Sequence, residues 1–182
     1  MNIIAIRHTA VDIIPGICYG RLDVPLSKTF ETEAKTIKNK LNINKYAAIH
    51  SSPSIRCKSL AIKFQNEIPI YYDANLLELN FGEWEGKMWK EISKTKLAKI
   101  WFKDWVNTPC PQGESYHNLK DRVNTFISSI KKQYTNQSII LITHGGVIKC
   151  LHSICNSISP QEALKIPIAY GSITNFCISI HL

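Results

Sequence analysis

The hydrophobic and polar positions of this 182-residue chain follow two alternating patterns. Short apolar runs bounded by polar or turn residues predict buried strands, and the clearest of them cover 2–6 and 139–142. Between such runs, apolar residues recur at helical spacing, as they do within 28–42. Strands that alternate with helices along a chain predict an α/β fold.

The same patterns place the remaining elements. We expect further strands over 46–50, 68–71 and 173–180, helices over 53–66, 115–134, 147–156 and directly after Ser159, and a helical region over about 88–105. Glycines and prolines mark long loops over 10–26 and 73–86. This order predicts a single domain over residues 1–182. Its architecture would be a three-layer sandwich, with helices on both faces of a mostly parallel central sheet.

Composition is that of an ordinary globular protein, with 45% hydrophobic and 20% charged residues. No apolar stretch is long enough to span a membrane, and the N-terminus lacks the basic start of a signal peptide, so we expect a cytoplasmic protein. The six cysteines form no C-x-x-C pair, which favours free thiols, with Cys177 packed inside the last strand. We expect neither a metal nor another cofactor.

The formal net charge of +8 comes mostly from lysine, because only four of the 22 basic residues are arginines, namely Arg7, Arg21, Arg56 and Arg122. No cluster of basic residues is dense enough for a nucleic-acid tail, so the lysines indicate a solvated surface that also attracts small anions. Arginine has a planar fork that grips phosphate with two hydrogen bonds. Arginines that stand inside motifs are therefore the more informative cations.

Three polar blocks follow predicted strands, at the edge where open α/β sheets bind ligands. They are Arg7-His8-Thr9, Ser51-Ser52-Pro53-Ser54-Ile55-Arg56 and Thr143-His144-Gly145-Gly146. The second block starts a helix whose free N–H groups favour an anion. Arg56 opposes the helix dipole there, so a bound anion explains it better than a solvated position, which stays the alternative. The blocks predict a phosphate site beside an imidazole that can attack phosphorus.

A fourth block, residues 77–86, places three acids among apolar and aromatic neighbours. A carboxyl group surrounded by apolar side chains holds its proton more readily and can act as a general acid. Glu78 is the first candidate because leucines flank it on both sides. Glu83 and Glu85 are either catalytic or, as we prefer, solvated loop charges.

Together these four blocks resemble the histidine phosphatase superfamily, whose best-known branch is phosphoglycerate mutase. The resemblance spans residue 3 to about 150, although Thr9 replaces a glycine that often follows the nucleophile. More narrowly, Asp12, the segment Cys18–Leu26 and the segment Phe81–Gly86 resemble α-ribazole phosphatases, which release the 5′-phosphate of α-ribazole phosphate in cobalamin lower-loop assembly. The resemblance implies a phosphoglycerate mutase-like fold with a helical lid at about 87–113.

The resemblance also implies a role for each site residue. His8 would be the nucleophile that becomes phosphohistidine, and Glu78 would protonate the leaving oxygen and then activate water. His144 would bind phosphoryl oxygens together with Arg7 and Arg56, acting as a hydrogen-bond donor in either its neutral or its cationic form. Further phosphate or substrate contacts are expected from Thr9, Gly20, Arg21, Gly145 and Glu114. Glu114 has a second interpretation, as part of a helix cap at Ser115.

The aromatic residues of the lid have two interpretations. Trp89, Trp101, Phe102 and Trp105 either pack into a helical cap, which we prefer, or include one ring that stacks on a benzimidazole. The expected partner is a small phosphorylated substrate, without nucleic acid or membrane. The oligomeric state stays open, a homodimer included.

Three functions compete with a dedicated α-ribazole phosphatase. They are a broad-specificity phosphatase, a phosphoglycerate mutase and a non-catalytic phosphate-binding module. Mutases of this type usually carry a longer lid insertion, and a pure binding module has no need of a general acid.

Overall fold

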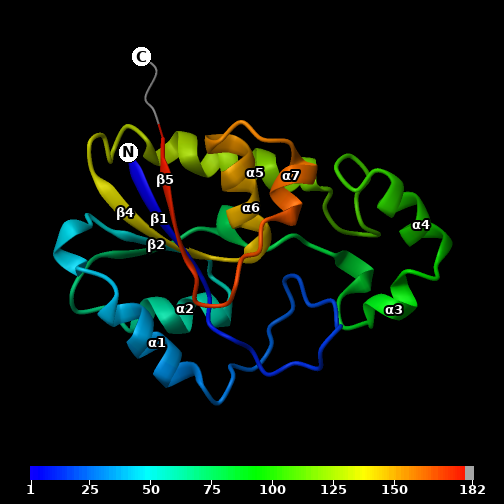
Figure 1. Cartoon of the computed structure of the whole chain (residues 1–182), viewed down its shortest axis with the longest axis horizontal. Coiled ribbons are helices and arrows are strands. Elements are labelled where there is room, and N and C mark those ends of the chain that lie inside the picture. Colours follow the sequence, from blue (N-terminus) through cyan, green and yellow to red (C-terminus); the bar gives the residue numbers. More distant parts are fainter. Residues whose placement is uncertain (179–182) are drawn as a thin grey trace.

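A five-stranded sheet forms the centre of the molecule (Figure 1). The structure is a computed structural model of the chain and describes residues 1–178. The strands are β1 (Asn2–Arg7), β2 (Ile49–Ser51), β3 (Ile70–Tyr72), β4 (Ser138–Thr143) and β5 (Ile173–Cys177). Their spatial order is β3-β2-β4-β1-β5, and of these five only β5, at one edge, runs antiparallel to its neighbour. The expected mostly parallel sheet is confirmed.

Helices cover both faces of the sheet. On one face lie α1 (Phe30–Asn39) and α2 (Ile55–Ile62), and on the other lie α5 (Tyr116–Ile130) and α6 (Gly145–Cys155), with α7 (Pro160–Lys165) packed on α6 (Figure 1). Strand residues alternate between the two layers, so Ile3 and Ala5 pack towards α5 and α6, whereas Ile6 packs towards α1 and α2. The expected three layers are therefore present.

The last strand departs from the sequence-based expectation at Cys177. We expected this side chain to be packed, but it is exposed, because Phe176 turns towards the core and its neighbour turns the opposite way at the sheet edge. The end of the predicted strand, residues 179 and 180, lies outside the described residues.

The helical region predicted over about 88–105 is confirmed, and it is divided. Two short helices occupy this region, α3 (Trp89–Ile92) and α4 (Lys96–Lys103). Thr95 separates them, because its hydroxyl accepts the N–H of Ala98 at 3.2 Å and so starts a new helix. Three short 3₁₀ turns complete the secondary structure, at Ile43–Lys45, Ala74–Leu76 and Gly82–Trp84.

The two short helices lie beyond one end of the sheet (Figure 1) and have a small core of their own. The buried members of this core are Cys18, Trp84, Ile92, Ala98 and Cys110. Trp89 and Trp101 pack against it, which agrees with the packed-cap interpretation for Trp89. Whether this region moves as a lid stays a prediction.

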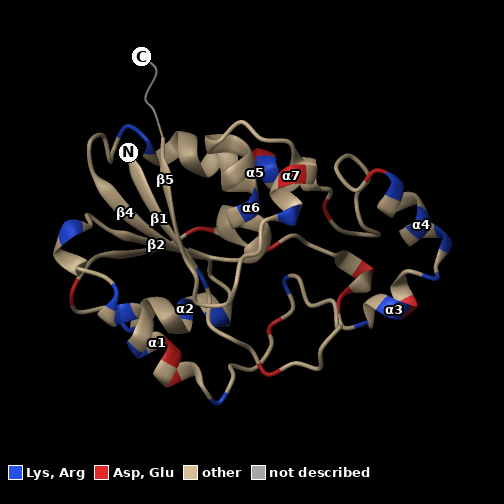
Figure 2. Cartoon of the chain, viewed as in Figure 1, with Lys and Arg blue, Asp and Glu red and all other residues tan. Residues whose placement is uncertain are grey.

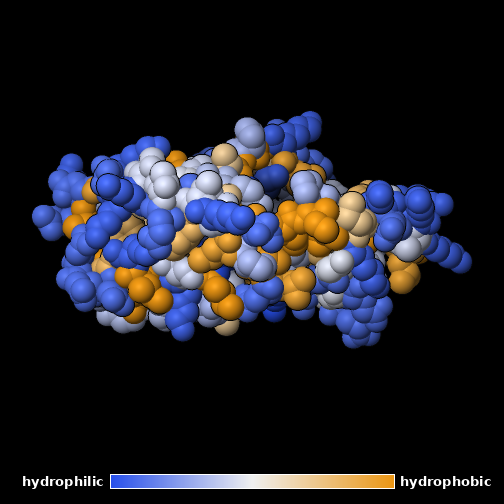
Figure 3. All heavy atoms as spheres, turned by 90° about the horizontal axis from the view of Figure 1, so that it is seen from below, coloured by the Kyte–Doolittle hydropathy of each residue, from blue (hydrophilic) through white to orange (hydrophobic). Residues whose placement is uncertain are grey.

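Charged residues are spread over the helices and loops around the sheet (Figure 2). Seen from below, the molecule is largely hydrophilic, with apolar side chains gathered towards the end that carries α3 and α4 (Figure 3). Within residues 1–178, no helix combines the length and the apolar character that crossing a membrane would need.

Candidate active site

Two of the polar blocks meet because the strands that precede them are parallel neighbours. Arg7 at the end of β1 pairs in register with Thr143 at the end of β4, so His8 and His144 leave the sheet side by side. Their ring centroids lie 5.2 Å apart at an interplanar angle of 64°. Ser51 at the end of β2 pairs with Ile142, which brings the Ser-Ser-Pro block to the same edge. The structure therefore gathers all three blocks.

His8 is held as a neutral imidazole. Its Nδ1 donates to the carbonyl oxygen of Thr9 at 2.8 Å, since a carbonyl can only accept, and this leaves Nε2 with a free lone pair. Burial of the ring, followed by the charge of Arg56 and then that of Arg7, lowers the pKa of His8 to about 3. A neutral imidazole with a free Nε2 is the form that can attack phosphorus.

His144 is fully buried beside it, at the start of α6. Its Nε2 lies 2.9 Å from the hydroxyl of Ser52 and 3.3 Å from that of Ser54. Burial, helped by the charge of Arg56, lowers the pKa of His144 well below its usual value. This lowered pKa favours the neutral form of His144 in the free protein, and the form that it takes beside a phosphoryl group stays a prediction.

Two arginines flank the imidazoles, and both are held by backbone carbonyls. Arg7 Nη1 donates to the carbonyl of Ile168 at 2.6 Å. Arg56, 1% exposed, donates to the carbonyls of Gly20 at 2.6 Å and Leu22 at 3.0 Å. Arg56 is thus not solvated, which removes the alternative left open by the sequence. Gly20 contributes its carbonyl oxygen to this arrangement.

The site around His8 contains buried donors without acceptors. Among the described residues, Arg7 Nε, Arg56 Nε and the hydroxyl of Thr9 find no hydrogen-bond partner. An unpaired buried polar group costs about 1–3 kcal/mol, so such a cluster favours a ligand that supplies acceptors. Within residues 1–178, no three His, Cys, Asp or Glu side chains are grouped as a metal site would require. The cluster suits an anion.

Glu78 lies half-buried next to the start of α6. Its carboxylate accepts the N–H of Leu79 at 2.9 Å and the N–H of Gly146 at 3.0 Å. A Cβ at position 146 would lie 2.2 Å from the Glu78 carboxylate, so only glycine allows this approach. Leu76 and Leu79 are buried in the core, and Leu79 and Phe81 line the same pocket as Glu78, so the desolvation of Glu78 by these neighbours stays a prediction.

Arg21 and Glu114 lie behind the Glu78 segment and contact one another. Their side chains form an ion pair at 2.7 Å, and Arg122 joins it with two hydrogen bonds of 3.0 Å to Glu114. Arg21 Nε and Arg122 Nη2 also donate to the carbonyl of Glu78, at 3.2 and 2.9 Å. A substrate contact for Arg21 and Glu114 stays a prediction, while their observed contacts fix the backbone of Glu78. The helix cap at Ser115 is made with Asn118 and not with Glu114.

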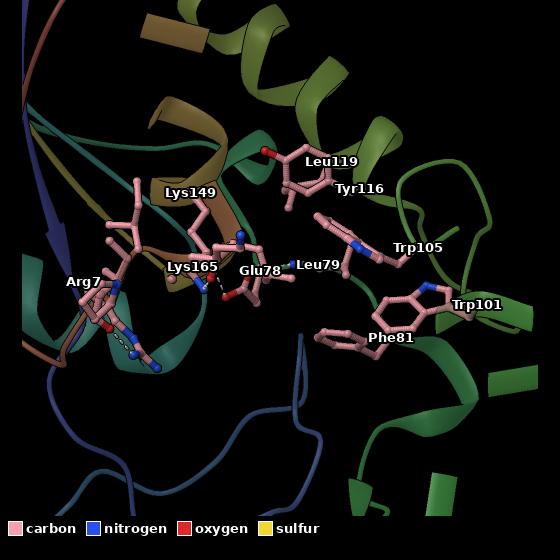
Figure 4. Close-up of a pocket in the computed structure, with 16 residues that line it drawn as sticks. Arg7, Glu78, Leu79, Phe81, Trp101, Trp105, Tyr116, Leu119, Lys149 and Lys165 are labelled. Carbon is pink, nitrogen blue, oxygen red and sulfur yellow. Dashed lines mark hydrogen bonds between the residues drawn. The ribbon is translucent and has the colours of Figure 1, made fainter. Parts of the chain in front are cut away.

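A pocket of about 400 Å³ opens beside these groups (Figure 4). Arg7 and Glu78 lie at one end, with Gly145 and Gly146 at the start of α6, and Lys149 and Lys165 lie near Glu78. The opposite end is aromatic and is formed by Phe81, Trp101, Trp105 and Tyr116. Of the lid aromatics, Trp101 and Trp105 thus line the pocket, whereas Phe102 is 49% exposed and does not line it. The pocket joins a polar end to an apolar end; Arg7 lines it, whereas His8, Arg56 and His144 lie outside its lining.

Several residues of this site were not found from the sequence. Arg122 stood outside every motif, although its rarity as one of four arginines was a usable signal. Ser52 and Ser54 were noted only as helix starters, yet both contact His144. Tyr170 lies against both Arg7 and His8, and no local pattern marked it.

Comparison with known proteins agrees with this geometry. The sequence model of the family described as "Histidine phosphatase superfamily (branch 1)" matches residues 3–180. The chain is 26% identical over 159 residues to "Phosphoserine phosphatase 1" of Hydrogenobacter thermophilus, a match that covers 84% of the chain and 74% of the relative. It is 24% identical over 156 residues to "Adenosylcobalamin/alpha-ribazole phosphatase" of Salmonella typhimurium, covering 83% of the chain and 77% of the relative.

Solved structures give the same fold. "Bacillus stearothermophilus YhfR" superposes with a TM-score of 0.85 at 25% identity, over 98% of this chain and 91% of that one. The family match covers nearly the whole sequence and includes the paired imidazoles and the flanking arginines. The chain belongs to the histidine phosphatase superfamily.

Proposed function

We propose that the protein hydrolyses a small phosphomonoester through a phosphohistidine at His8, and that α-ribazole 5′-phosphate is its substrate. One observation carries the proposal. His8 and His144 lie together between two arginines whose buried Nε atoms find no partner within the described residues. Phosphoryl oxygens are the acceptors that such charged donors match best.

The residues support a two-step reaction. In the first step Nε2 of His8 attacks phosphorus, the bond from phosphorus to the ester oxygen breaks, and Glu78 gives a proton to the leaving oxygen. Arg7 and Arg56 stabilise the negative charge that spreads over the other phosphoryl oxygens. In the second step water attacks phosphorus and gives a proton to Glu78, and the P–N bond breaks. Inorganic phosphate leaves, and His8 is neutral again.

The aromatic end of the pocket supports the choice of α-ribazole 5′-phosphate as the substrate. Phe81, Trp101 and Trp105 offer stacking area for a benzimidazole base, while the polar end receives the 5′-phosphate. A relative named for α-ribazole phosphate adds to this support. A second candidate, phosphoserine, is favoured by the relative named as a phosphoserine phosphatase. Serine, however, would leave the aromatic end unfilled.

A comparison of substrates tests the proposal. Phosphate release should be fastest, as kcat/KM, with α-ribazole 5′-phosphate, and it should exceed that with phosphoserine or 3-phosphoglycerate by roughly tenfold or more. His8→Ala should abolish all of these activities. Isomerisation of 3-phosphoglycerate without phosphate release would favour a mutase, and tight binding without turnover would favour a binding module. Equal rates on all esters would indicate a broad-specificity phosphatase.

Variants of the aromatic end sharpen the test. Trp105→Leu should lower kcat/KM for α-ribazole phosphate roughly tenfold and leave phosphoserine hydrolysis nearly unchanged. Phe102→Leu is the matched control, because Phe102 is an exposed aromatic residue of the same region that does not line the pocket. A Trp105 variant that loses both activities equally would contradict the assignment of the base to this end.

A further inference from the structure

Two tyrosines from opposite ends of the chain meet over the buried nucleophile. The hydroxyl of Tyr19, in the loop before α1, lies 2.8 Å from the hydroxyl of Tyr170, in the turn before β5, although 151 positions separate them. This distance is that of a well-formed O–H···O hydrogen bond. Tyr170 is 39% exposed, whereas His8 is 1% exposed and its ring centroid lies 5.4 Å from that of Tyr170. The pair therefore separates solvent from His8 on this side.

Each tyrosine ring also lies against one of the two site arginines. The guanidinium carbon of Arg7 is 3.9 Å from the ring centroid of Tyr170, and that of Arg56 is 5.2 Å from the centroid of Tyr19. Both distances fall within the range of an attractive cation–π contact. These are the same arginines whose Nε atoms lack a partner among the described residues. The hydroxyl bond thus links the two cations that would hold a phosphoryl group.

Backbone contacts fix both tyrosines to the site. The N–H of Gly171 donates to the carbonyls of Arg7 and His8, at 3.2 and 3.1 Å, and this holds Tyr170 over them. Gly171 has a φ of +65°, which favours glycine at this turn. On the other side, Arg56 donates to the carbonyl of Gly20, the residue after Tyr19. Neither tyrosine is a loosely placed surface ring.

The Tyr19 phenol stays neutral at physiological pH. Burial, together with the hydrogen bond to Tyr170, raises the pKa of Tyr19 to about 12. A neutral Tyr19 hydroxyl can share a hydrogen bond with Tyr170 without repelling an incoming phosphate.

We propose that Tyr19 and Tyr170 form a strap, joined by their hydroxyl groups, that holds Arg7 and Arg56 at the spacing that a phosphoryl group needs and shields His8 from solvent. Both tyrosines are positioning residues, since they act through the arginines. The inference rests on the proposed function, because it concerns the same phosphate site.

Removing each hydroxyl alone and both together tests the strap. Tyr19→Phe, Tyr170→Phe and the double variant keep both rings, and the hydroxyl bond lies at the surface, so the core is untouched. Each single variant should weaken competitive inhibition by inorganic phosphate, and lower kcat/KM, by roughly three- to tenfold, the effect of one lost hydrogen bond. The double variant should be no worse than either single variant, because both remove the same bond. The strap would be overturned if the losses of the two single variants multiplied in the double variant, or if either single variant behaved like the wild type.

A second comparison separates the hydroxyl bond from the ring contact. Tyr170→Leu also removes the ring from Arg7, so it should bind phosphate more weakly than Tyr170→Phe, and equal behaviour of the two variants would contradict the positioning role. Tyr72→Phe is the matched control, because Tyr72 is an exposed tyrosine whose ring faces Lys58 and not a site arginine. An inactive wild-type protein that forms no phosphohistidine would refute the proposed function. An active wild-type protein with unaffected tyrosine variants would refute only the strap.

Discussion

Replacing Glu114 by glutamine tests whether this residue supports the Glu78 segment or binds substrate. The Glu114 carboxylate accepts four hydrogen bonds, from Arg21 at 2.7 Å, twice from Arg122 at 3.0 Å, and from the N–H of Asn80 at 3.1 Å. The amide of glutamine keeps one of the two acceptor oxygens and replaces the other by an NH₂ group. Two of the four donors would then face another donor and lose their hydrogen bonds. The side chain is only 17% exposed, so water replaces the lost contacts poorly.

The expected loss of stability follows from these contacts. A hydrogen bond to a charged group contributes about 1.5–3 kcal/mol, and removing one partner of a buried ion pair costs about 3–5 kcal/mol. Because the pair is only partly buried, we expect Glu114→Gln to lower the free energy of unfolding by about 2–4 kcal/mol. For a chain of this size that corresponds to a fall in Tm of roughly 5–15 °C. Thermal and urea unfolding measure it.

The kinetic effect distinguishes the two roles. Arg21 and Arg122 hold the carbonyl of Glu78, so displaced arginines should misplace the general acid and lower kcat, with KM nearly unchanged. Glu31→Gln is the control, because it breaks an ion pair with Lys63 in which the Glu31 side chain is 74% exposed, and it should cost less than about 1 kcal/mol. A Glu114→Gln protein of normal stability with a raised KM would refute this reasoning and favour direct substrate binding.

Three further predictions concern Glu78, His8 and Arg56. Gly146→Ala should lower kcat by roughly a hundredfold while the protein stays folded, because the added Cβ meets the Glu78 carboxylate. An unchanged kcat in steady-state assays would exclude that contact. The free energy of unfolding of the wild type, measured with urea, should fall as the pH falls from about 6.5 towards 3. In this range the unfolded chain binds a proton at position 8 that the neutral, folded His8 does not bind, which costs up to about 1.4 kcal/mol per pH unit. His8→Asn should reduce this slope, to which His144 also contributes, and an identical slope would contradict the neutral imidazole of His8. Arg56→Lys should both lower Tm and weaken inhibition by inorganic phosphate, because lysine has no planar fork that could hold the Gly20 carbonyl and phosphate at once. Retained inhibition would disprove that Arg56 serves both the fold and phosphate binding.

The parts of the fold that the sequence predicted well are those with local causes. The apolar runs of β1 and β4 are buried on both faces of the sheet, so their hydrophobicity alone marked them as central strands. Polar residues directly after such strands lie at one edge in any parallel sheet, which is why His8 and His144 could be paired before their distance was known.

What the sequence did not predict depends on contacts between distant segments. Arg122 reaches the Glu78 loop from a helix 44 positions further along, and Tyr170 reaches Tyr19 across 151 positions, so no local spacing reports either contact. The sequence predicted a helical region over about 88–105 but not its division at Thr95, where the hydroxyl that accepts the N–H of Ala98 starts a second helix. The lowered pKa of His144 follows from complete burial, which a sequence does not reveal.

The central claim is that His8 becomes phosphorylated during turnover. The most direct measurement is a rapid quench into base of the protein with α-ribazole 5′-phosphate or p-nitrophenyl phosphate, followed by peptide mapping in a mass spectrometer. We expect a phosphoryl group on the peptide that contains His8. This group should be stable in base, lost in acid and absent from the His8→Ala protein. Turnover without any such adduct, or an adduct on another residue in an active His8→Ala protein, would contradict the claim.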